Sequence, residues 1–151
     1  VKSYFEHRKH RMHDTQVIHQ LGRNEDKAAW RRFYNRHHIP NVVFEYMHDL
    51  ASLYQLADLV LCRAGAGTLF ELLFFETNAI VIPLETATTV HQIANAHAIA
   101  AEHPQQFSCI AQAIAHANGH AVLFGLIDQK LLKPTEAQFM PLKTQAVAQV
   151  S

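Results

Sequence analysis

Cysteine is scarce in this chain of 151 residues: Cys62 and Cys109 are its two cysteines, and both lie in apolar runs. With neither a CxxC spacing nor a disulfide framework, the sequence indicates a reducing compartment. An excess of one charge is also missing, since 13 Lys and Arg balance 13 Asp and Glu. This balance argues against a protein that coats nucleic acid, and we expect no nucleic-acid partner.

Long apolar runs are missing as well. No stretch approaches the roughly 18 uninterrupted apolar residues of a membrane span, and the charged N-terminal residues do not resemble a signal peptide. The chain is 49% hydrophobic and 17% charged, which excludes a disordered acidic or basic tail. Its length suits one compact domain, and we expect a soluble intracellular protein.

Between residues 16 and 102, short apolar segments alternate with amphipathic ones. The pattern predicts strands over 16–20, 41–46, 58–62 and 79–83. It predicts helices from Asn24 or Asp26 to about 36, over 50–57, from the turn at 63–67 to 75, and over 90–102. This alternation predicts an α/β fold: a Rossmann-like parallel sheet with helices on both faces and its strand-to-helix turns at one edge. The pattern predicts no elements over 1–14 or 104–151.

The segment 58–71 carries the most chemical information, because a buried strand runs into a glycine-rich turn and then a helix. Gly65 and Gly67 allow tight backbone geometry and the close approach of a ligand, while the first amides of the helix favour an anion. Thr68 adds a hydroxyl donor. The dinucleotide fingerprint is not met, because Phe70 stands at its third glycine position, and a Walker Lys-Ser/Thr pair is missing. A turn that only connects packed elements is the alternative.

Two polar groups extend this site. Glu71 follows Thr68 by three residues, and a carboxylate there can accept hydrogen bonds from both hydroxyls of a ribose while the turn holds phosphates. A glutamate that only interacts with the helix dipole is the alternative. The second group is His91, Gln92 and Asn95, at the start of the helix over 90–102. These side chains suit a hydroxyl-rich ligand, although helix capping also explains them.

In order and spacing, these motifs resemble the C-terminal, nucleotide-sugar-binding domain of the MurG-like glycosyltransferases (glycosyltransferase family 28). The resemblance covers roughly residues 16–100 and is carried by Ala57-Asp58, Cys62-Arg63-Ala64-Gly65-Ala66 with Thr68 and Glu71, Pro83, and His91-Gln92 with Asn95-Ala96. It implies the truncated C-terminal half of a GT-B glycosyltransferase. On this basis, residues 1–103 form a partial nucleotide-sugar-binding domain and 104–151 a poorly matching extension of it.

The resemblance also implies an activity: an inverting hexosyltransferase that moves N-acetylglucosamine from UDP-GlcNAc to lipid I (undecaprenyl-pyrophosphoryl-MurNAc-pentapeptide), forming lipid II for peptidoglycan. Glu71 would bind the ribose, the turn would hold the pyrophosphate, the backbone of Met47 would contact uracil, and His91 and Gln92 would contact the sugar. The implied UDP-GlcNAc-binding residues are Met47, Arg63, Gly65, Ala66, Gly67, Thr68, Glu71, His91, Gln92 and Asn95. Arg63 would either contact the ligand or brace the turn.

The resemblance implies no catalytic residue, metal or other cofactor on this chain. The polyprenyl-linked acceptor would be bound by a missing N-terminal domain or a partner subunit, so the chain alone would bind donor with little or no turnover. The complete enzyme would be cytoplasmic and peripheral on the inner face of the cell membrane. Alternatives are the donor-binding subunit of a split transferase acting on another polyprenyl-linked sugar, or a non-catalytic nucleotide-sugar-binding remnant.

The sequence departs from the family in two places that concern the fold. Glu76-Thr77-Asn78 replaces the glycine and proline expected before the strand over 79–83. The glycine-serine phosphate motif that follows the domain's first strand is also absent, and we expect it upstream of Val1. In the remnant interpretation, loss of that central strand would leave two exposed strand edges.

Twelve histidines raise the alternative of a metal site. His7, His10 and His13 recur at a spacing of three, and His116 and His120 at a spacing of four. No HExxH, CxxC or carboxylate set completes such a site, so solvated helix faces explain these histidines better.

Overall fold

A computed structural model describes residues 2–8, 15–86, 88–111, 120–132 and 145–150, with the backbone alone for Leu132 and 145–150. The strands are β1 (Thr15–Gln20), β2 (Asn41–Phe44), β3 (Leu59–Cys62), β4 (Ala79–Val81), β5 (Phe107–Cys109) and β6 (Gln145–Val150). The helices are α1 (Lys2–His7), α2 (Lys27–Arg36), α3 (Ala51–Leu56), α4 (Ala66–Phe74), α5 (Val90–Glu102) and α7 (His120–Leu132).

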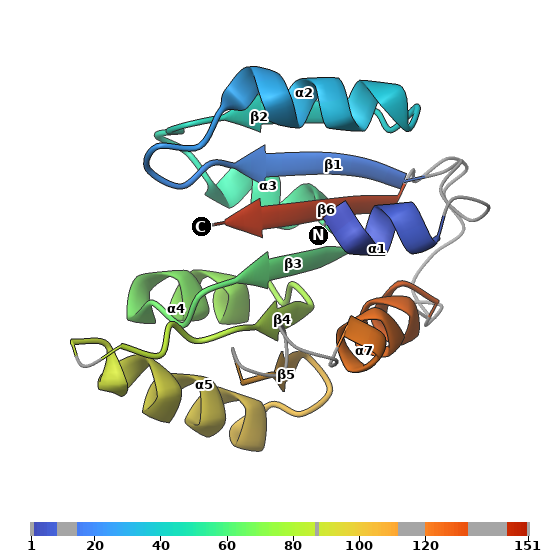
Figure 1. Ribbon diagram of the computed structural model, residues 1–151. Helices are drawn as coiled ribbons and strands as arrows, with labels where there is room; N and C mark the ends of the chain where they lie inside the picture. The colour runs from blue at the N-terminus through green and yellow to red at the C-terminus, as the bar shows by residue number, and fades with distance from the viewer. Residues whose placement is uncertain (1, 9–14, 87, 112–119, 133–144, 151) are drawn as a thin grey trace.

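The described strands form one six-stranded sheet in the order β2-β1-β6-β3-β4-β5 (Figure 1). Every pairing in it is parallel. Strand β6 lies between β1 and β3, with Val147 in register with Val17 on one side and with Leu59 on the other. The sheet is therefore continuous where the remnant interpretation expected two exposed edges.

Helices cover both faces of this sheet. On one face, Leu59 and Leu61 of β3 belong to a core with α1, α2 and α7. On the other face, Val60 and Cys62 belong to a core with α3, α4 and α5. Side chains alternate along a strand, so burial of all four β3 residues requires apolar partners on both sides. The predicted class, a Rossmann-like parallel sheet with two helical layers, is confirmed.

The predicted elements between 16 and 102 are all present, with shifted ends. Helix α2 begins after Asp26, whose carboxylate accepts hydrogen bonds from the amides of Ala28 (2.8 Å) and Ala29 (3.0 Å); this is a side-chain N-cap. Strand β2 ends at Phe44, two residues before the predicted end, because Glu45 and Tyr46 are exposed and lie past the last ladder residue. Four further elements, α1, β5, α7 and β6, were not predicted.

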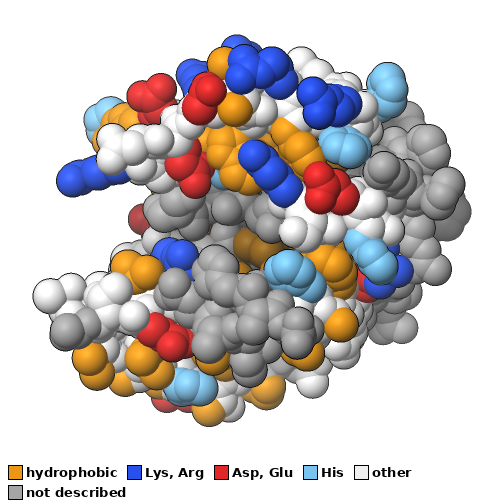
Figure 2. Space-filling view, in the orientation of Figure 1, with side chains coloured by type: hydrophobic (Ala, Val, Ile, Leu, Met, Phe, Trp, Pro, Cys, Tyr) orange, Lys and Arg blue, Asp and Glu red, His pale blue; other side chains and the backbone are white. Residues whose placement is uncertain are grey.

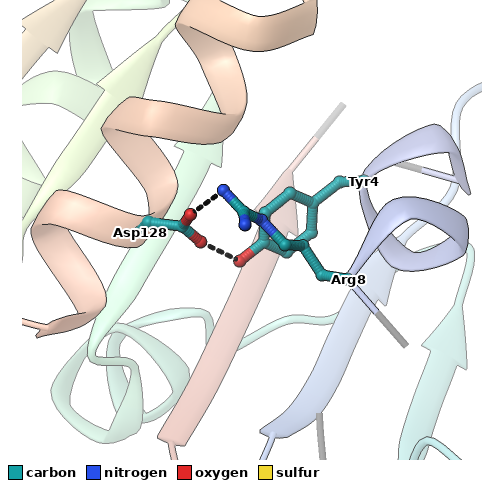
Figure 3. A network of polar contacts seen from close by, with 3 residues as sticks. All are labelled: Tyr4, Arg8 and Asp128. Carbon is teal, nitrogen blue, oxygen red and sulfur yellow. Dashed lines mark hydrogen bonds and ion pairs between the residues drawn. The ribbon is translucent and has the colours of Figure 1, made fainter. Parts of the chain in front are cut away.

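A polar network ties α1 to α7 at the end of the sheet away from the strand tips. The Tyr4 hydroxyl donates to Asp128 Oδ1 at 2.9 Å, and the guanidinium of Arg8 pairs with the other oxygen of the same carboxylate (Figure 3). The rings of Tyr4 and Phe124 pack edge to face at 5.3 Å. Segments separated by more than a hundred residues are thereby joined.

The C-terminal end of α4 shows how the chain builds the turn that lacks the expected glycine. Glu76 takes a left-handed conformation (φ 53°), which glycine usually occupies after a helix. The amides of Glu76 and Thr77 return to the carbonyls of Leu73 (3.2 Å) and Leu72 (3.0 Å), the two bonds of a Schellman motif. The side chain of Gln106 then donates to the carbonyls of Leu72 (2.8 Å) and Thr77 (3.0 Å). These hydrogen bonds hold the turn in a conformation that glycine would adopt more readily.

Candidate functional site

The candidate site lies at the edge of the sheet where the parallel strands end. The turns that follow β1, β2, β3 and β4 all leave from this edge, on the left of Figure 1. In the same orientation, Figure 2 shows the surface hollowed on this side, between the part formed by α2 and β2 and the part formed by α4 and α5. Ligands of doubly wound α/β sheets bind at this edge, where the strand order reverses.

Helix α4 opens directly at this edge and its first turn is uncapped. Gly65, the N-cap residue, provides no side-chain cap, and the first helical bond runs from the Leu69 amide to the Gly65 carbonyl at 3.0 Å. The amides of Ala66, Gly67 and Thr68 therefore precede the helical ladder. Ala66 and Gly67 are exposed. A helix start of this kind presents donors and the positive end of the helix dipole to an anion.

The two glycines of the turn act differently from the prediction. Gly65 has φ −68° and Gly67 lies inside α4, so neither needs the left-handed backbone that only glycine adopts readily, and the expected tight geometry is wrong. A Cβ on Gly67 would meet nothing within 4 Å, and one on Gly65 would lie 3.9 Å from Thr68 Oγ1. The space beside Gly67 at the helix start is open. This agrees with the expected close approach of a ligand.

Thr68 and Glu71 both belong to this first part of α4. Thr68 is half-buried and Glu71 is exposed. Both act on Tyr54 of α3: burial chiefly raises the pKa of the Tyr54 hydroxyl to about 12, the negative charge of Glu71 adds to that rise, and the Thr68 hydroxyl opposes it. Both members of the predicted pair therefore lie near a buried phenol that was not among the predicted site residues.

Arg63 braces the edge. Its Nη1 donates to the carbonyl of Ile82 at 3.1 Å, which ties the residue after β3 to the residue after β4. Of the two predicted roles, this bond supports bracing, and it holds the starts of the turns after β3 and β4 at a fixed spacing.

The second predicted cluster is His91, Gln92 and Asn95, and its members lie in different surroundings. Gln92 accepts a hydrogen bond from the Leu84 amide at 3.2 Å through its side-chain oxygen, so it stabilises the loop between β4 and α5. His91 is exposed. Asn95 lines a groove of about 190 Å³ between α4 and α5, which Ala66 also lines. The structure therefore brings Asn95 together with the glycine-rich turn.

Met47, the residue expected beside the base, lies in the loop between β2 and α3 and is half-buried. The loop that holds Met47 begins at the same edge of the sheet as α4. It follows β2, whereas α4 follows β3 on the other side of β6. Its assignment to uracil rests on the resemblance and stays a prediction.

A buried histidine near this edge was not among the predicted site residues. His19 of β1 is fully buried, and its Nδ1 lies 3.1 Å from the Tyr34 hydroxyl. Burial lowers the pKa of His19 to about 4, so the ring is neutral at pH 7 and shares a hydrogen bond with the phenol. The Trp30 ring packs edge-on against it at 4.4 Å. These rings hold α2 on β1, and His19 itself is too deeply buried to contact a ligand.

Nucleophilic and metal chemistry find little support. Burial raises the pKa of Cys62 to about 12, and burial together with the charge of Glu85 raises that of Cys109. Among the described residues, no three His, Cys, Asp or Glu side chains group around a point that could hold a metal ion. His10, His13 and His116 of the metal alternative lie outside the described residues. No helix in the described ranges has the length and apolarity needed to cross a bilayer.

An all-parallel sheet with two helical layers and an open helix start at its carboxyl edge defines the doubly wound, Rossmann-like class. Comparison with known families makes the assignment specific. The model of the glycosyltransferase family 28 C-terminal domain matches residues 1–116, so the chain belongs to this family, whose domain is the C-terminal half of a GT-B glycosyltransferase.

Curated proteins named UDP-N-acetylglucosamine–N-acetylmuramyl-(pentapeptide) pyrophosphoryl-undecaprenol N-acetylglucosamine transferase are among the relatives of this chain. The relative from Myxococcus xanthus is 43% identical over 82 residues, which is 54% of this chain and 21% of the relative. Those from Hahella chejuensis (41% over 80 residues; 53% and 22%) and Pseudomonas fluorescens (39% over 87; 58% and 24%) are similar. The chain thus spans less than a quarter of these relatives' length. No solved structure matches it.

Proposed function

We propose that this chain is the UDP-GlcNAc-binding part of a hexosyltransferase that transfers N-acetylglucosamine to lipid I, forming lipid II. The relatives' printed name supports the reaction. The observation that carries the proposal is the uncapped, exposed start of α4 with Thr68 and Glu71 in its first turns. A helix start with a nearby carboxylate matches the two chemistries of a nucleotide diphosphate, an anion and a ribose diol.

In the proposed reaction, UDP is the leaving group, and negative charge grows on its diphosphate as the bond to the sugar breaks. The amides of Ala66, Gly67 and Thr68 would stabilise that charge, because they are fixed by the helix before the reaction begins. Glu71 would accept from the ribose hydroxyls. His91 and Asn95 at the start of α5 would face the sugar, while Arg63 and Gln92 hold the two loops in place.

The chain contributes no proposed catalytic acid or base. The base that deprotonates the acceptor hydroxyl, and the site for the polyprenyl-linked acceptor, would come from a domain or subunit outside this sequence. The assembled enzyme would work at the inner face of the cytoplasmic membrane, where such an acceptor is embedded. We therefore expect the chain by itself to bind donor and to show little or no transfer.

Calorimetric titration tests this proposal. The purified chain should bind UDP-GlcNAc saturably, more tightly than UDP-glucose and much more tightly than ADP-glucose. Equal affinity for the three nucleotide sugars would refute the proposed specificity. No binding to a chain that unfolds cooperatively would refute donor binding altogether.

A further inference from the structure

The buried hydroxyl of Tyr54 has no hydrogen-bond partner in its surroundings. The residue lies in α3 and is 1% exposed. It packs in the core beneath α4, with Ala64, Leu69 and Leu72. Its hydroxyl oxygen is buried without a hydrogen-bond partner. Buried polar groups are nearly always paired, so an unpaired phenol at this place requires an explanation.

The Tyr54 hydroxyl lies close to two residues of the candidate site. Thr68 and Glu71, one turn apart on α4, are near enough to shift its pKa, and burial and Glu71 outweigh Thr68 to raise it to about 12. The phenol is therefore protonated at pH 7 and can only act there as a donor or acceptor of hydrogen bonds. Thr68 is close to it, yet the two hydroxyls do not make a bond of ordinary geometry.

The backbone holds Tyr54 firmly on this side of α4. Its carbonyl accepts a hydrogen bond from the Thr77 hydroxyl at 2.9 Å, which links the end of α3 to the turn after α4. The ring is packed in the core with Leu69 and Leu72, so it has little freedom to move toward another partner. A small rotation of the Thr68 side chain is the simpler way to bring the two hydroxyls together.

We propose that Tyr54 is a positioning residue of the diphosphate site: its hydroxyl donates a hydrogen bond to the Thr68 hydroxyl when ligand binds and so directs the Thr68 proton at a phosphate oxygen. A threonine hydroxyl has one proton to donate and can accept from another donor. Phosphate oxygens at neutral pH accept only. When the Thr68 oxygen accepts a hydrogen bond from Tyr54, the Thr68 proton is directed away from Tyr54 and toward the phosphate. This inference rests on the proposed function.

The test compares four chains, the unaltered one, Tyr54→Phe, Thr68→Val and the double variant, by titration with UDP and with uridine. Tyr54→Phe should weaken UDP binding about three- to tenfold, the scale of one hydrogen bond, and leave uridine binding unchanged. The double variant should bind UDP no more weakly than Thr68→Val, because both substitutions remove the same interaction. The melting temperature of Tyr54→Phe should stay the same or rise, since the hydroxyl has no partner to lose.

Tyr4→Phe is the matched control. The Tyr4 hydroxyl is bonded to Asp128 between α1 and α7, which lie away from the strand tips (Figure 1), so its removal should lower the melting temperature and leave UDP affinity unchanged. Unaltered UDP affinity in Tyr54→Phe would overturn the inference. So would equal losses for UDP and uridine, or additive losses in the double variant. If the unaltered chain fails to bind UDP, the proposed function and this inference are both refuted. If that chain binds UDP and Tyr54→Phe has no effect, only the inference is refuted.

Discussion

The two ends of helix α4 differ in how their backbone groups are satisfied. At the C-terminal end, the two Schellman bonds and the Gln106 side chain pair the carbonyls of the last turn and close it. At the N-terminal end, Gly65 provides no side-chain cap, and the first residues are exposed. Natural helices usually pair both ends. We infer that the closed end serves stability and that the open end serves a ligand.

The comparison extends to the other face of the sheet, where His19 is buried and neutral. With a pKa lowered from 6.5 to about 4, the folded protein binds fewer protons than the unfolded chain between these values. The contribution of His19 to stability is therefore present above pH 6.5 and is lost as the pH falls toward 4. We expect urea unfolding to show a loss of about 3 kcal/mol over this range.

The matched variant for this pH effect is His19→Gln, which cannot titrate there and can still form a hydrogen bond with Tyr34. Its unfolding free energy should fall less steeply between pH 6.5 and pH 4 than that of the unaltered chain. Parallel pH profiles for the two chains would show that His19 is not responsible.

At the closed end of α4, Gln106→Leu should lower the unfolding free energy by about 2 kcal/mol, because two backbone carbonyls lose a partner. UDP affinity should not change. Gln105→Leu is the control: the neighbouring side chain is exposed, and its loss should change stability by less than about 0.5 kcal/mol. A similar effect of both substitutions in chemical denaturation would contradict the assigned clamp.

At the open end, Glu71→Ala should have the reverse effect. UDP binding should weaken by about 1–3 kcal/mol, since charge-assisted hydrogen bonds to the ribose would be lost, while the exposed position predicts little change in stability. Titration with UDP and thermal unfolding of the same sample measure both. Unchanged affinity in a folded variant would remove Glu71 from the site.

The smallest effect concerns the strained turn. Glu76→Gly should stabilise the protein by about 1 kcal/mol, because glycine adopts φ 53° without a Cβ penalty. The control is Glu102→Gly, near the end of α5, which should destabilise, as a glycine inside a helix does. A loss of stability in Glu76→Gly would mean that the glutamate side chain contributes more than its backbone costs.

The elements between 16 and 102 were predictable because their signals are local: apolar periodicity, the cap at Asp26 and the glycine-rich turn. Strand β6 was not, because its place between β1 and β3 depends on pairing with both at long range. The same holds for α1 and α7, which are joined through Asp128 across 120 residues. The proposed division of the domain at residue 103 stays a prediction.

The candidate site was predictable as a set of residue types and only partly as a set of roles. The open start of α4 follows from the glycine-rich turn after a buried strand. The bracing bonds of Arg63 and Gln92 do not follow, because their partners Ile82 and Leu84 are backbone groups of a neighbouring loop. The buried hydroxyl of Tyr54 could not be distinguished from an ordinary core ring until the packing of α3 under α4 was known. Contacts of the site residues with donor remain proposals.

The most direct test of the open end is a UDP titration of the isotopically labelled chain, followed by the amide resonances of α4. We predict that the amides of Ala66, Gly67 and Thr68 shift saturably, while those of Glu76 and Thr77 at the closed end do not move. Shifts spread equally over both ends, or confined to residues away from the start of α4, would contradict the account.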